Sequence, residues 1–493
     1  MRSLLATIPS PTRSRNATHA VLAVALAAAC AGVGAGTARA ADAVTITLRG
    51  TSATASSTQG VTISGSTVTI TAAGTYKFTG TLTDGQVLVN SSGSGEVALV
   101  LDGARIANNS GSAVRITKAS SVALTLAEGS SNTLSDAYVY PEETPEATLH
   151  SVADLTIGGT GSLTVRGNAA DGIASTAGMT ITSGNITVNA ADDDIRAKAF
   201  LTVTGGNITG TSAGGDGLKT TDKSSASVGR MTINGGTIDL DVEKRCLQAS
   251  NSLTINNGTL ELSCGGKALD AKASLTVTGG RTTVVQSREG VESTVISIKG
   301  GSLAVTSSDD GLNATDGSTP ADQVSDTARL LISGGTVVLD AEGDGLDSNG
   351  SAELTGGTVV VNGPTTTAGN VVAVEGTFTD IAGTLLAVDA SSKIQTPGQG
   401  SQGFVSVPFG SSRPEGTTVQ IVNSAGTVVA GYRADKPFRS LLHASQQITS
   451  RQAYRIYTGG TLSGTSVGGL YTGGSTSGAT LVTTVTAAGG PTP

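Results

Sequence analysis

The sequence has no tryptophan, three cysteines and three methionines, and only 3% of its residues are aromatic. Between residues 155 and 362 the one aromatic residue is Phe200. This stretch therefore has no row of rings on which the sugars of a crystalline polymer could stack. Beyond the first forty residues, no apolar run is long enough to span a bilayer. These absences favour a mature protein that is soluble or held at the surface by something else and that uses ionic and hydrogen-bonding recognition.

Positive charge is also scarce. The formal net charge is −8, and the first forty residues hold four arginines and no acid, so their removal takes the charge to −12. That sign opposes nucleic acid and anionic membranes unless a cation intervenes. We expect no nucleic-acid partner, no transmembrane segment in the mature chain, and a monomer.

The first forty residues have the pattern of a secretory signal peptide. A basic start precedes an apolar run over residues 20–35, and Ala38-Arg39-Ala40 is a cleavage pattern. We predict cleavage after Ala40 and a secreted or cell-surface location. A lipoprotein signal at Cys30 is the lesser alternative, because Ala27 stands where a bulky aliphatic residue is expected.

Glycine is abundant, at 68 residues, and short alternating runs of Val, Ile, Thr and Ser accompany it. This is a composition of strands and turns. From Leu155 a unit of about 22 residues recurs. Each unit contains two alternating triplets around a Gly-rich corner, a loop, and a third short strand. The landmark hydrophobic residues of the units are Ile157, Ile181, Val203, Ile233, Ile255, Val277, Ile298, Ile332 and Leu354.

Three short strands per unit indicate a three-sided coil. Each strand would pair in parallel with its equivalent one coil on, about 4.8 Å away. The usual handedness of parallel crossovers makes the winding right-handed. The predicted fold class is all-β, a right-handed parallel β-helix, with positive φ at corner glycines such as Gly235-Gly236.

The chain divides into five predicted segments: a signal peptide (1–40), opening coils of the β-helix (41–154), regular repeats (155–365), C-terminal coils with an antiparallel β cap (366–460), and a Gly/Ser/Thr-rich tail (461–493). The cap is expected because longer strands follow Thr417, with Asn423-Ser-Ala-Gly as a hairpin turn. A cap would also cover the unpaired strand edges of the last coil.

Charged residues recur at one register of the third strand. Aligning the units superposes Asp171, Asp193, Asp216, Arg245, Lys267, Glu289, Asp310 and Asp344. Carboxylates one coil apart would repel each other by roughly 3.5 kcal/mol per adjacent pair at an effective dielectric constant near 20. A counter-charge is therefore expected beside the acids.

Arg245 and Lys267 supply that charge in the middle of the alignment, and calcium is the best candidate in the two acidic stretches. It takes six to eight oxygens in loose geometry. We predict two calcium clusters, with ligands among Asp171, Asp192, Asp193, Asp194, Asp216, Glu289, Asp309, Asp310, Asp344 and Asp347. The alternative is a solvated ladder of Asp-Gly turns without metal, since Asp-Gly is favoured in turns for backbone reasons.

A second stripe follows from strand alternation, because the residue after each inward aliphatic should point outward. It consists of Ala174, Arg196, Lys219, Gln248, Asp270, Glu292, Asn313 and Asp347. Arg196 and Lys219 lie beside the first acidic stretch, so we predict that they bind an acidic glycan together with calcium. The alternative is that both are ordinary solvated charges.

Several passages resemble a bacterial family of secreted carbohydrate-binding β-helix proteins: TAAGTYKFTGTLTDGQVLVN, VALVLDGARIANNSGSAVRI, LTLAEGSSNTLSDA, SVADLTIGGTGSLTVRGNAADGIAS and GGDGLKTTD. The resemblance covers residues 44–365. It implies a right-handed parallel β-helix that binds calcium and polysaccharide, notably acidic pectin-type polymers, without catalysis. The family's Asp-Gly-Ile/Leu signature maps onto Asp171, Asp216, Asp310 and Asp344, and the sequence departs from it at Asp193-Asp194-Ile195, Arg245-Cys246-Leu247 and Lys267-Ala268-Leu269.

Two other functions compete with non-catalytic, calcium-dependent binding of an acidic polysaccharide. A β-helix lyase or hydrolase acting on pectin-type polymers would use carboxylates together with a histidine. Outside the leader only His150 and His443 exist, both away from the repeats, and Gly-His-Gly and Asn-Thr-Asp segments are absent. We therefore expect no enzyme. A structural or adhesin-like surface rod is the third possibility.

Two cysteines remain after the leader, Cys246 and Cys264, on neighbouring coils. A disulfide fits an exported protein, while their offset fits two separate buried thiols. A metal site at this pair is not expected, because no third soft ligand is near.

Overall fold

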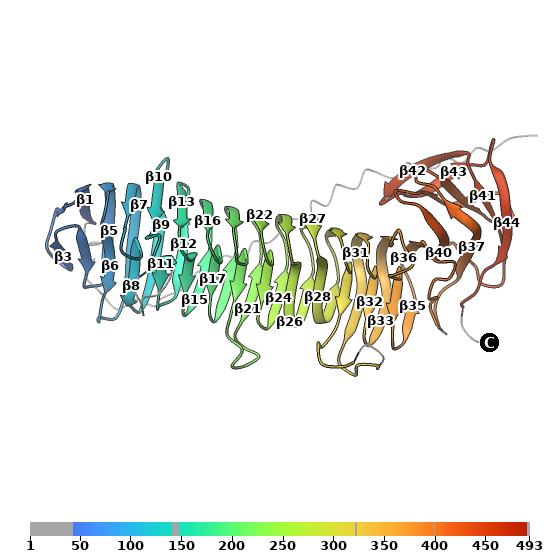
Figure 1. Cartoon of the computed structure of the whole chain (residues 1–493), viewed down its shortest axis with the longest axis horizontal. Coiled ribbons are helices and arrows are strands. Elements are labelled where there is room, and N and C mark those ends of the chain that lie inside the picture. The colour runs from blue at the N-terminus through green and yellow to red at the C-terminus, as the bar shows by residue number, and fades with distance from the viewer. Residues whose placement is uncertain (1–42, 141–146, 321–322, 399, 491–493) are drawn as a thin grey trace, which may run out of the picture. The chain divides into compact units, whose positions relative to one another are not determined.

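The computed structural model describes residues 43–140, 147–320, 323–398 and 400–490, and over these residues the chain is all-β (Figure 1). The strands form one sheet of 38 strands and one of six. The described residues contain no helix, and so none of a length and apolarity that could cross a bilayer. The all-β prediction is confirmed. The predicted signal peptide lies outside the described residues.

The 38-stranded sheet contains three ladders of parallel strands. The first ladder consists of β1 (Val44–Gly50), β5 (Gly74–Leu82), β7 (Glu96–Ala107), β9 (Ser121–Leu126), β12 (Leu155–Gly159), β15 (Gly178–Ile181), β18 (Phe200–Val203), β21 (Arg230–Ile233), β24 (Ser252–Ile255), β26 (Lys267–Val277), β28 (Glu289–Ile298), β31 (Arg329–Ala341), β33 (Ser351–Asn362) and β35 (Phe378–Asp380).

The second ladder begins in the later parts of β1, β5 and β7. It continues through β10 (Ser131–Ser135), β13 (Ser162–Gly167), β16 (Asn185–Ala190), β19 (Asn207–Ser212), β22 (Thr237–Val242), β25 (Thr259–Cys264), β27 (Arg281–Ser287), β29 (Ser302–Ser307), the later parts of β31 and β33, and β36 (Thr384–Asp389).

The third ladder is made of the shortest strands. It consists of β4 (Thr67–Ile70), β6 (Gln86–Asn90), β8 (Val114–Lys118), β11 (Ala147–Ser151), β14 (Asp171–Ser175), β17 (Ile195–Ala197), β20 (Leu218–Thr220), β23 (Leu247–Ala249), the first parts of β26 and β28, β30 (Leu312–Ala314), β32 (Leu346–Ser348) and β34 (Val372–Val374).

One strand from each ladder makes one coil, and the register from coil to coil is the one that the sequence alignment predicts. The landmark residues superpose without a shift, from Ile157↔Ile181 to Ile332↔Leu354. All are at most 1% exposed and belong to one hydrophobic core. Burial of each such side chain contributes about 1.5–3 kcal/mol, so this stacking is a principal source of stability.

Of the two glycines at each corner, the second has the predicted positive φ and the first does not. Gly236 has a φ of +91°, which L residues with side chains rarely adopt. A Cβ atom at this position would also lie 2.7 Å from the carbonyl oxygen of Gly206, one coil back. Both conformation and close backbone packing therefore require glycine at this corner.

At the N-terminal end of the large sheet, two short strands pair antiparallel with strands of the first coils. β2 (Ala53–Ala55) pairs with β1, and β3 (Val61–Ser64) pairs with β4. At the other end of the sheet, β40 (Phe438–Ser445) pairs antiparallel with β36 and with β37 (Phe404–Arg413). Antiparallel strands therefore close the large sheet at both of its ends.

The six-stranded sheet is antiparallel and is formed by β38 (Thr418–Val422), β39 (Val428–Arg433), β41 (Ala453–Thr458), β42 (Thr461–Val467), β43 (Leu470–Ser475) and β44 (Thr480–Thr486). The turn at Asn423 joins β38 to β39, as predicted. The prediction of a separate tail from residue 461 is wrong, because β42, β43 and β44 belong to this sheet.

A second hydrophobic core joins the two sheets. It includes Val360 and Leu386 from the second ladder together with Ile421 and Tyr432 from the small sheet. These two ladder residues are in register with one another, on the face that carries Thr209 and Asp239 in earlier coils. The change from polar to apolar residues on this face is what allows the small sheet to pack there.

Cys246 and Cys264 are buried free thiols in the core of the large sheet. Of the two alternatives open from the sequence, the structure has the pair of thiols.

Candidate functional site: a charged column on the third ladder

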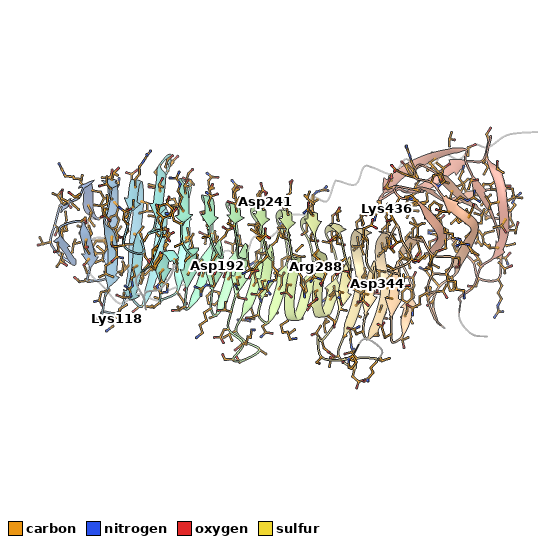
Figure 2. The ribbon with its side chains drawn as sticks, viewed as in Figure 1. Lys118, Asp192, Asp241, Arg288, Asp344 and Lys436 are labelled. Carbon is orange, nitrogen blue, oxygen red and sulfur yellow. The ribbon has the colours of Figure 1, made fainter. Side chains whose placement is uncertain are left out.

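The eight aligned charged residues lie in one register at the start of the third-ladder strands. We call this set, Asp171, Asp193, Asp216, Arg245, Lys267, Glu289, Asp310 and Asp344, the charged column. Strand pairing superposes Lys267 on Glu289, and the residues two positions later superpose from Ile173 to Leu346. Figure 2 labels Asp192 near one end of the column, Asp344 near the other, and Arg288 between them.

Column aspartates bind the backbone of the next coil. A carboxylate oxygen of Asp193 accepts the N–H of Asp216 at 2.8 Å, and Asp310 accepts the N–H of Asp344 at 2.8 Å. Asp344 in turn accepts the N–H of Asn370 at 2.6 Å. Since this bond recurs in the early and late coils, it is a structural role of the aspartates, as the alternative without metal proposes. It uses one oxygen and leaves the other for a further partner.

For the first three residues of the column, Asp171, Asp193 and Asp216, that further partner is a cation from the outward stripe. Arg196 Nε donates to Asp171 Oδ2 at 2.6 Å. Lys219 Nζ lies 2.9 Å from Oδ2 of both Asp193 and Asp216. The three acids are at most 3% exposed. We call Asp171, Asp193 and Asp216 the N-terminal acid group; its repulsion is relieved by protein side chains.

The middle of the column is also neutralised. Arg245 holds Asp216 through Nε at 2.9 Å and Nη2 at 3.0 Å, and its Nη1 reaches Asp270 at 3.0 Å. Lys267 pairs with Glu292 and lies 3.8 Å from Glu289. Arg288 contacts Glu289 and lies 3.2 Å from Asp309. The predicted ligands Glu289 and Asp309 are therefore already paired with cations.

The last coils lack such cations. We call Asp310, Asp344 and Asp347 the C-terminal acid group. Among the described residues, no Lys or Arg forms an ion pair with any of the three. Asp310 accepts a bond from Asn313 Nδ2 at 3.1 Å, and all three side chains are partly exposed.

Burial and ion pairs both act on the pKa values of the column. Burial, followed by repulsion from Asp310, Asp344 and Glu375, raises the pKa of Asp347 to about 8. Burial raises the pKa of Asp310 to about 6, with repulsion from Asp309 and Asp344 adding to it. In the N-terminal acid group, bonds to Arg245 and Lys219 outweigh burial at Asp216 and lower its pKa, whereas burial outweighs Arg196 at Asp171 and raises its pKa to about 6. Burial therefore raises carboxyl pKa values in both groups, and the C-terminal acid group differs in having no ion pair with a described Lys or Arg.

The geometry for a metal is tightest at the other end. Carboxylate oxygens of Asp171, Asp192 and Asp193 lie within 4.8 Å of one another, the one such group found among the described residues. Arg196 already lies against two of these three acids. A metal ion here would compete with a guanidinium group that is already in place.

The prediction that Asp194 is a metal ligand is wrong. Asp194 takes the place of glycine in the Asp-Gly signature, and its side chain points into the core, where a Cβ atom added to Gly210 would lie 2.4 Å from Oδ2. Neither carboxylate oxygen has a hydrogen-bond partner among the described residues. Burial, followed by repulsion from Asp193, raises its pKa to about 8.

Two residues near the column were missed from the sequence. His150 was placed away from the repeats, but strand pairing puts it in the outward stripe, aligned with Arg115 on one side and Ala174 on the other. Burial and the charges of Arg115 and Arg196 lower its pKa to about 4. Glu375 follows β34 and adds to the C-terminal acid group; the alignment of Val-Ala-Val-Glu-Gly with Leu-Asp-Ser-Asn-Gly would have revealed it.

Comparison with known proteins gives two relatives. A protein of Acetivibrio thermocellus described as a carbohydrate-binding domain-containing protein is 41% identical over 141 residues, which are 28% of this chain and 49% of the relative. The match thus spans about half the length of that relative. A solved structure of a polysaccharide lyase-like protein from C. thermocellum, in a gadolinium derivative, is 35% identical with a TM-score of 0.47, covering 48% of this chain and 96% of the other.

A family model described as carbohydrate-binding domain-containing protein matches residues 64–319. The match is more than half of the 493 residues. It includes the N-terminal acid group and Asp310 but ends before Asp344 and Asp347. The chain belongs to this family of carbohydrate-binding domain-containing proteins.

Proposed function

We propose that this protein is an exported, non-catalytic binder of acidic polysaccharide, that it depends on calcium, and that its parallel ladders wind as a right-handed β-helix. Membership of a carbohydrate-binding family supports the polysaccharide as partner. The handedness follows from the rule for parallel crossovers. Export follows from the sequence pattern of the first forty residues.

The C-terminal acid group is the observation that carries the calcium proposal. Its carboxylates are close enough to raise each other's pKa, and no described cation relieves them. Asp310 and Asp344 lie on adjacent coils, and the strand spacing of about 4.8 Å matches two calcium–oxygen distances of about 2.4 Å. Asp310, Asp344 and Asp347 would hold the ion, with Glu375 near. Calcium bound at this surface supplies a positive charge that can bridge to the carboxylates of a glycan.

Arg196 and Lys219 have a smaller part in this proposal than the sequence predicts. Both are engaged with buried acids of the column. A sugar carboxylate would have to share or displace these partners, which costs part of the gain. We therefore place the main glycan contact at the C-terminal acid group, with the two cations as secondary contacts.

The test compares retention of the mature chain on immobilised polygalacturonate in calcium and in a chelator. We expect retention only with calcium, and its loss in an Asp344→Asn, Asp347→Asn double variant. A matched control is Asp239→Asn with Asp241→Asn, which removes the same charge from the exposed face of β22. Retention in the chelator, or equal loss in both double variants, would contradict the proposal.

Lyase or hydrolase activity on the same polymers is a second candidate, because His150 lies in the ladder beside Arg115 and near Arg196. Product analysis on the retention samples decides between the two functions. Unsaturated or reducing ends that disappear in a His150→Ala variant would select the enzyme. Retention without products selects the binding protein.

A further inference from the structure

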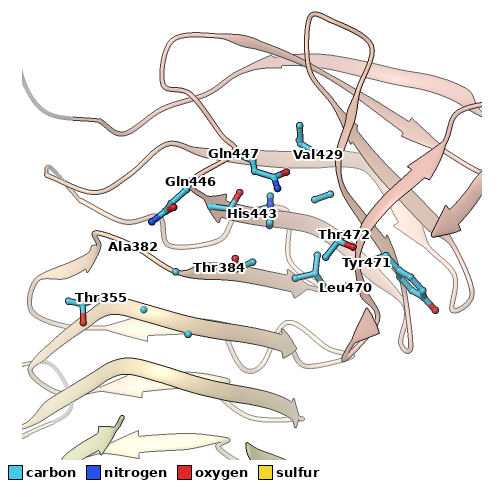
Figure 3. A pocket seen from close by; sticks show the side chains of 15 residues that line it. Thr355, Ala382, Thr384, Val429, His443, Gln446, Gln447, Leu470, Tyr471 and Thr472 are labelled. Atoms are coloured by element: carbon cyan, nitrogen blue, oxygen red, sulfur yellow. The ribbon is translucent and has the colours of Figure 1, made fainter. Parts of the chain in front are cut away.

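A cavity of about 500 Å³ lies where the end of the large sheet meets the six-stranded sheet, away from the charged column. Its walls come from the turn before β36, from β40, and from β39 and β43 (Figure 3). Sites for small molecules have volumes of about 300–1,000 Å³. No Asp, Glu, Lys or Arg is among the residues that line it.

Two buried polar groups in the cavity wall lack partners. His443 and Ser445 alternate along β40, so their side chains lie on the same face of the strand. They are 1% and 7% exposed. Neither Nε2 of His443 nor Oγ of Ser445 has a hydrogen-bond partner among the described residues. Buried polar atoms are rarely left unpaired, so an occupant of the cavity is expected to satisfy them.

The histidine specifies what kind of group that occupant must offer. Nδ1 of His443 lies 3.0 Å from the carbonyl oxygen of Leu385, which can only accept a hydrogen bond. Nδ1 therefore carries the proton, and Nε2 is an acceptor in the neutral ring. Burial lowers the pKa of His443 to about 4, so the ring is neutral at pH 7. The occupant has to donate an O–H or N–H to Nε2.

The other lining residues suit a compact, uncharged and partly apolar molecule. Leu470 supplies an apolar surface and Gln446 and Gln447 exposed amides at the rim, while the ring of Tyr471 points away from the cavity (Figure 3). A pyranose presents C–H groups that pack on an aliphatic side chain such as Leu470, and hydroxyl groups at its edge. We propose that this cavity binds one neutral sugar residue, whose hydroxyls bond to His443 Nε2 and Ser445 Oγ. This site is independent of calcium and of the proposed acidic glycan.

The test uses the mature chain in a chelator, with the methyl glycosides of glucose, galactose and xylose as probes in saturation-transfer NMR. We expect signal transfer from at least one of them. An Ala382→Phe variant fills the cavity from the turn before β36 and should abolish the transfer. Ser445→Ala removes one bond and should weaken binding roughly tenfold. Ser406→Ala, on the neighbouring strand β37 and outside the cavity, is the matched control.

Several results would overturn this site. If no neutral glycoside transfers signal, the cavity holds only water. If Ala382→Phe or Ser445→Ala binds like the unchanged protein, the sugar binds elsewhere. If galacturonate binds here as well as the neutral sugars do, the occupant is not selected by the absence of charge. Ser445→Ala removes a single oxygen, so the test remains available if Ala382→Phe does not fold. Loss of polygalacturonate retention alone leaves this proposal standing.

Discussion

The two ends of the charged column have the same backbone arrangement, but one end is neutralised by cations and the other has an excess of negative charge. In both, an aspartate accepts the N–H of the next coil. Lys219 stands in the outward stripe beside the N-terminal acid group, and Asp347 stands at the equivalent position beside the C-terminal one. One repeat can therefore serve as a self-neutralised structural ladder or as an excess of negative charge, according to one outward residue per coil.

Exchanging that residue should give the largest effect on calcium binding. Asp347→Lys places an ammonium group beside Asp310 and Asp344, as Lys219 lies beside Asp193 and Asp216. We expect the calcium affinity to fall tenfold or more, which is a loss of about 1.4 kcal/mol or more in binding free energy. The calcium-dependent retention on polygalacturonate should weaken with it. Calcium titration calorimetry measures the affinity. Unchanged calcium affinity would show that the two ends do not differ in the way described.

Removal of a cation from the neutralised end should give the largest effect on folding stability. Arg245→Ala leaves Asp216, which is fully buried, with Lys219 as its cation. We expect the free energy of unfolding to fall by roughly 2–3 kcal/mol. This is below the usual range for breaking a buried ion pair, because Arg245 is one-third exposed.

Urea unfolding at pH 7 measures the Arg245→Ala loss. The pKa of Asp216 is lowered in the folded protein, so the stability from this pair is present above about pH 4 and disappears as the pH falls below the folded value. A loss as large at pH 3 as at pH 7 would assign the effect to packing.

The uncompensated end should make stability depend on pH. The pKa values of Asp310 and Asp347, about 6 and about 8, exceed the value near 4 of an unfolded chain. These groups hold protons longer when folded, so the stability of the metal-free protein should decrease from pH 5 to pH 8. Over this pH range we expect the free energy of unfolding to fall by on the order of 1 kcal/mol for each of the two carboxyl groups.

Thermal unfolding in a chelator measures this slope. Asp347→Asn should reduce it, and calcium should reduce it in the unchanged protein but not in the variant. An identical slope in Asp347→Asn would place the titrating groups elsewhere.

The smallest expected effect concerns Asp194, which belongs to neither acid group. Asp194→Ala removes an unpaired buried carboxylate and introduces the residue that the structure has at Ala268 in the equivalent place. We expect the free energy of unfolding at pH 8 to rise by about 1 kcal/mol. This is the net effect after subtracting the cost of the small cavity that the shorter side chain leaves. Asp192→Ala, at an exposed neighbour, is the control. A destabilised Asp194→Ala would show that the carboxylate has a partner in solution.

The repeat itself was predictable because inward aliphatics, corner glycines and column residues all recur with one period. That pattern placed Asp171, Asp193 and Asp216 on one ladder, and the strand pairing agrees. The pairing of charges was not predictable. The sequence shows which residues share a ladder, but the direction in which a long side chain turns depends on neighbours one coil away. Arg196 thus reaches back to Asp171, and Asp194 points into the core.

The sequence alone determined an all-β chain with parallel repeats, one hydrophobic core and a column of charge, because burial of a periodic pattern leaves one register in which every aliphatic residue is inside. The tertiary structure decided where that charge remains unpaired, that β41 to β44 complete a second sheet, and that His443 and Ser445 line a cavity. These features depend on contacts between segments without a shared period, so no local pattern in the sequence reports them.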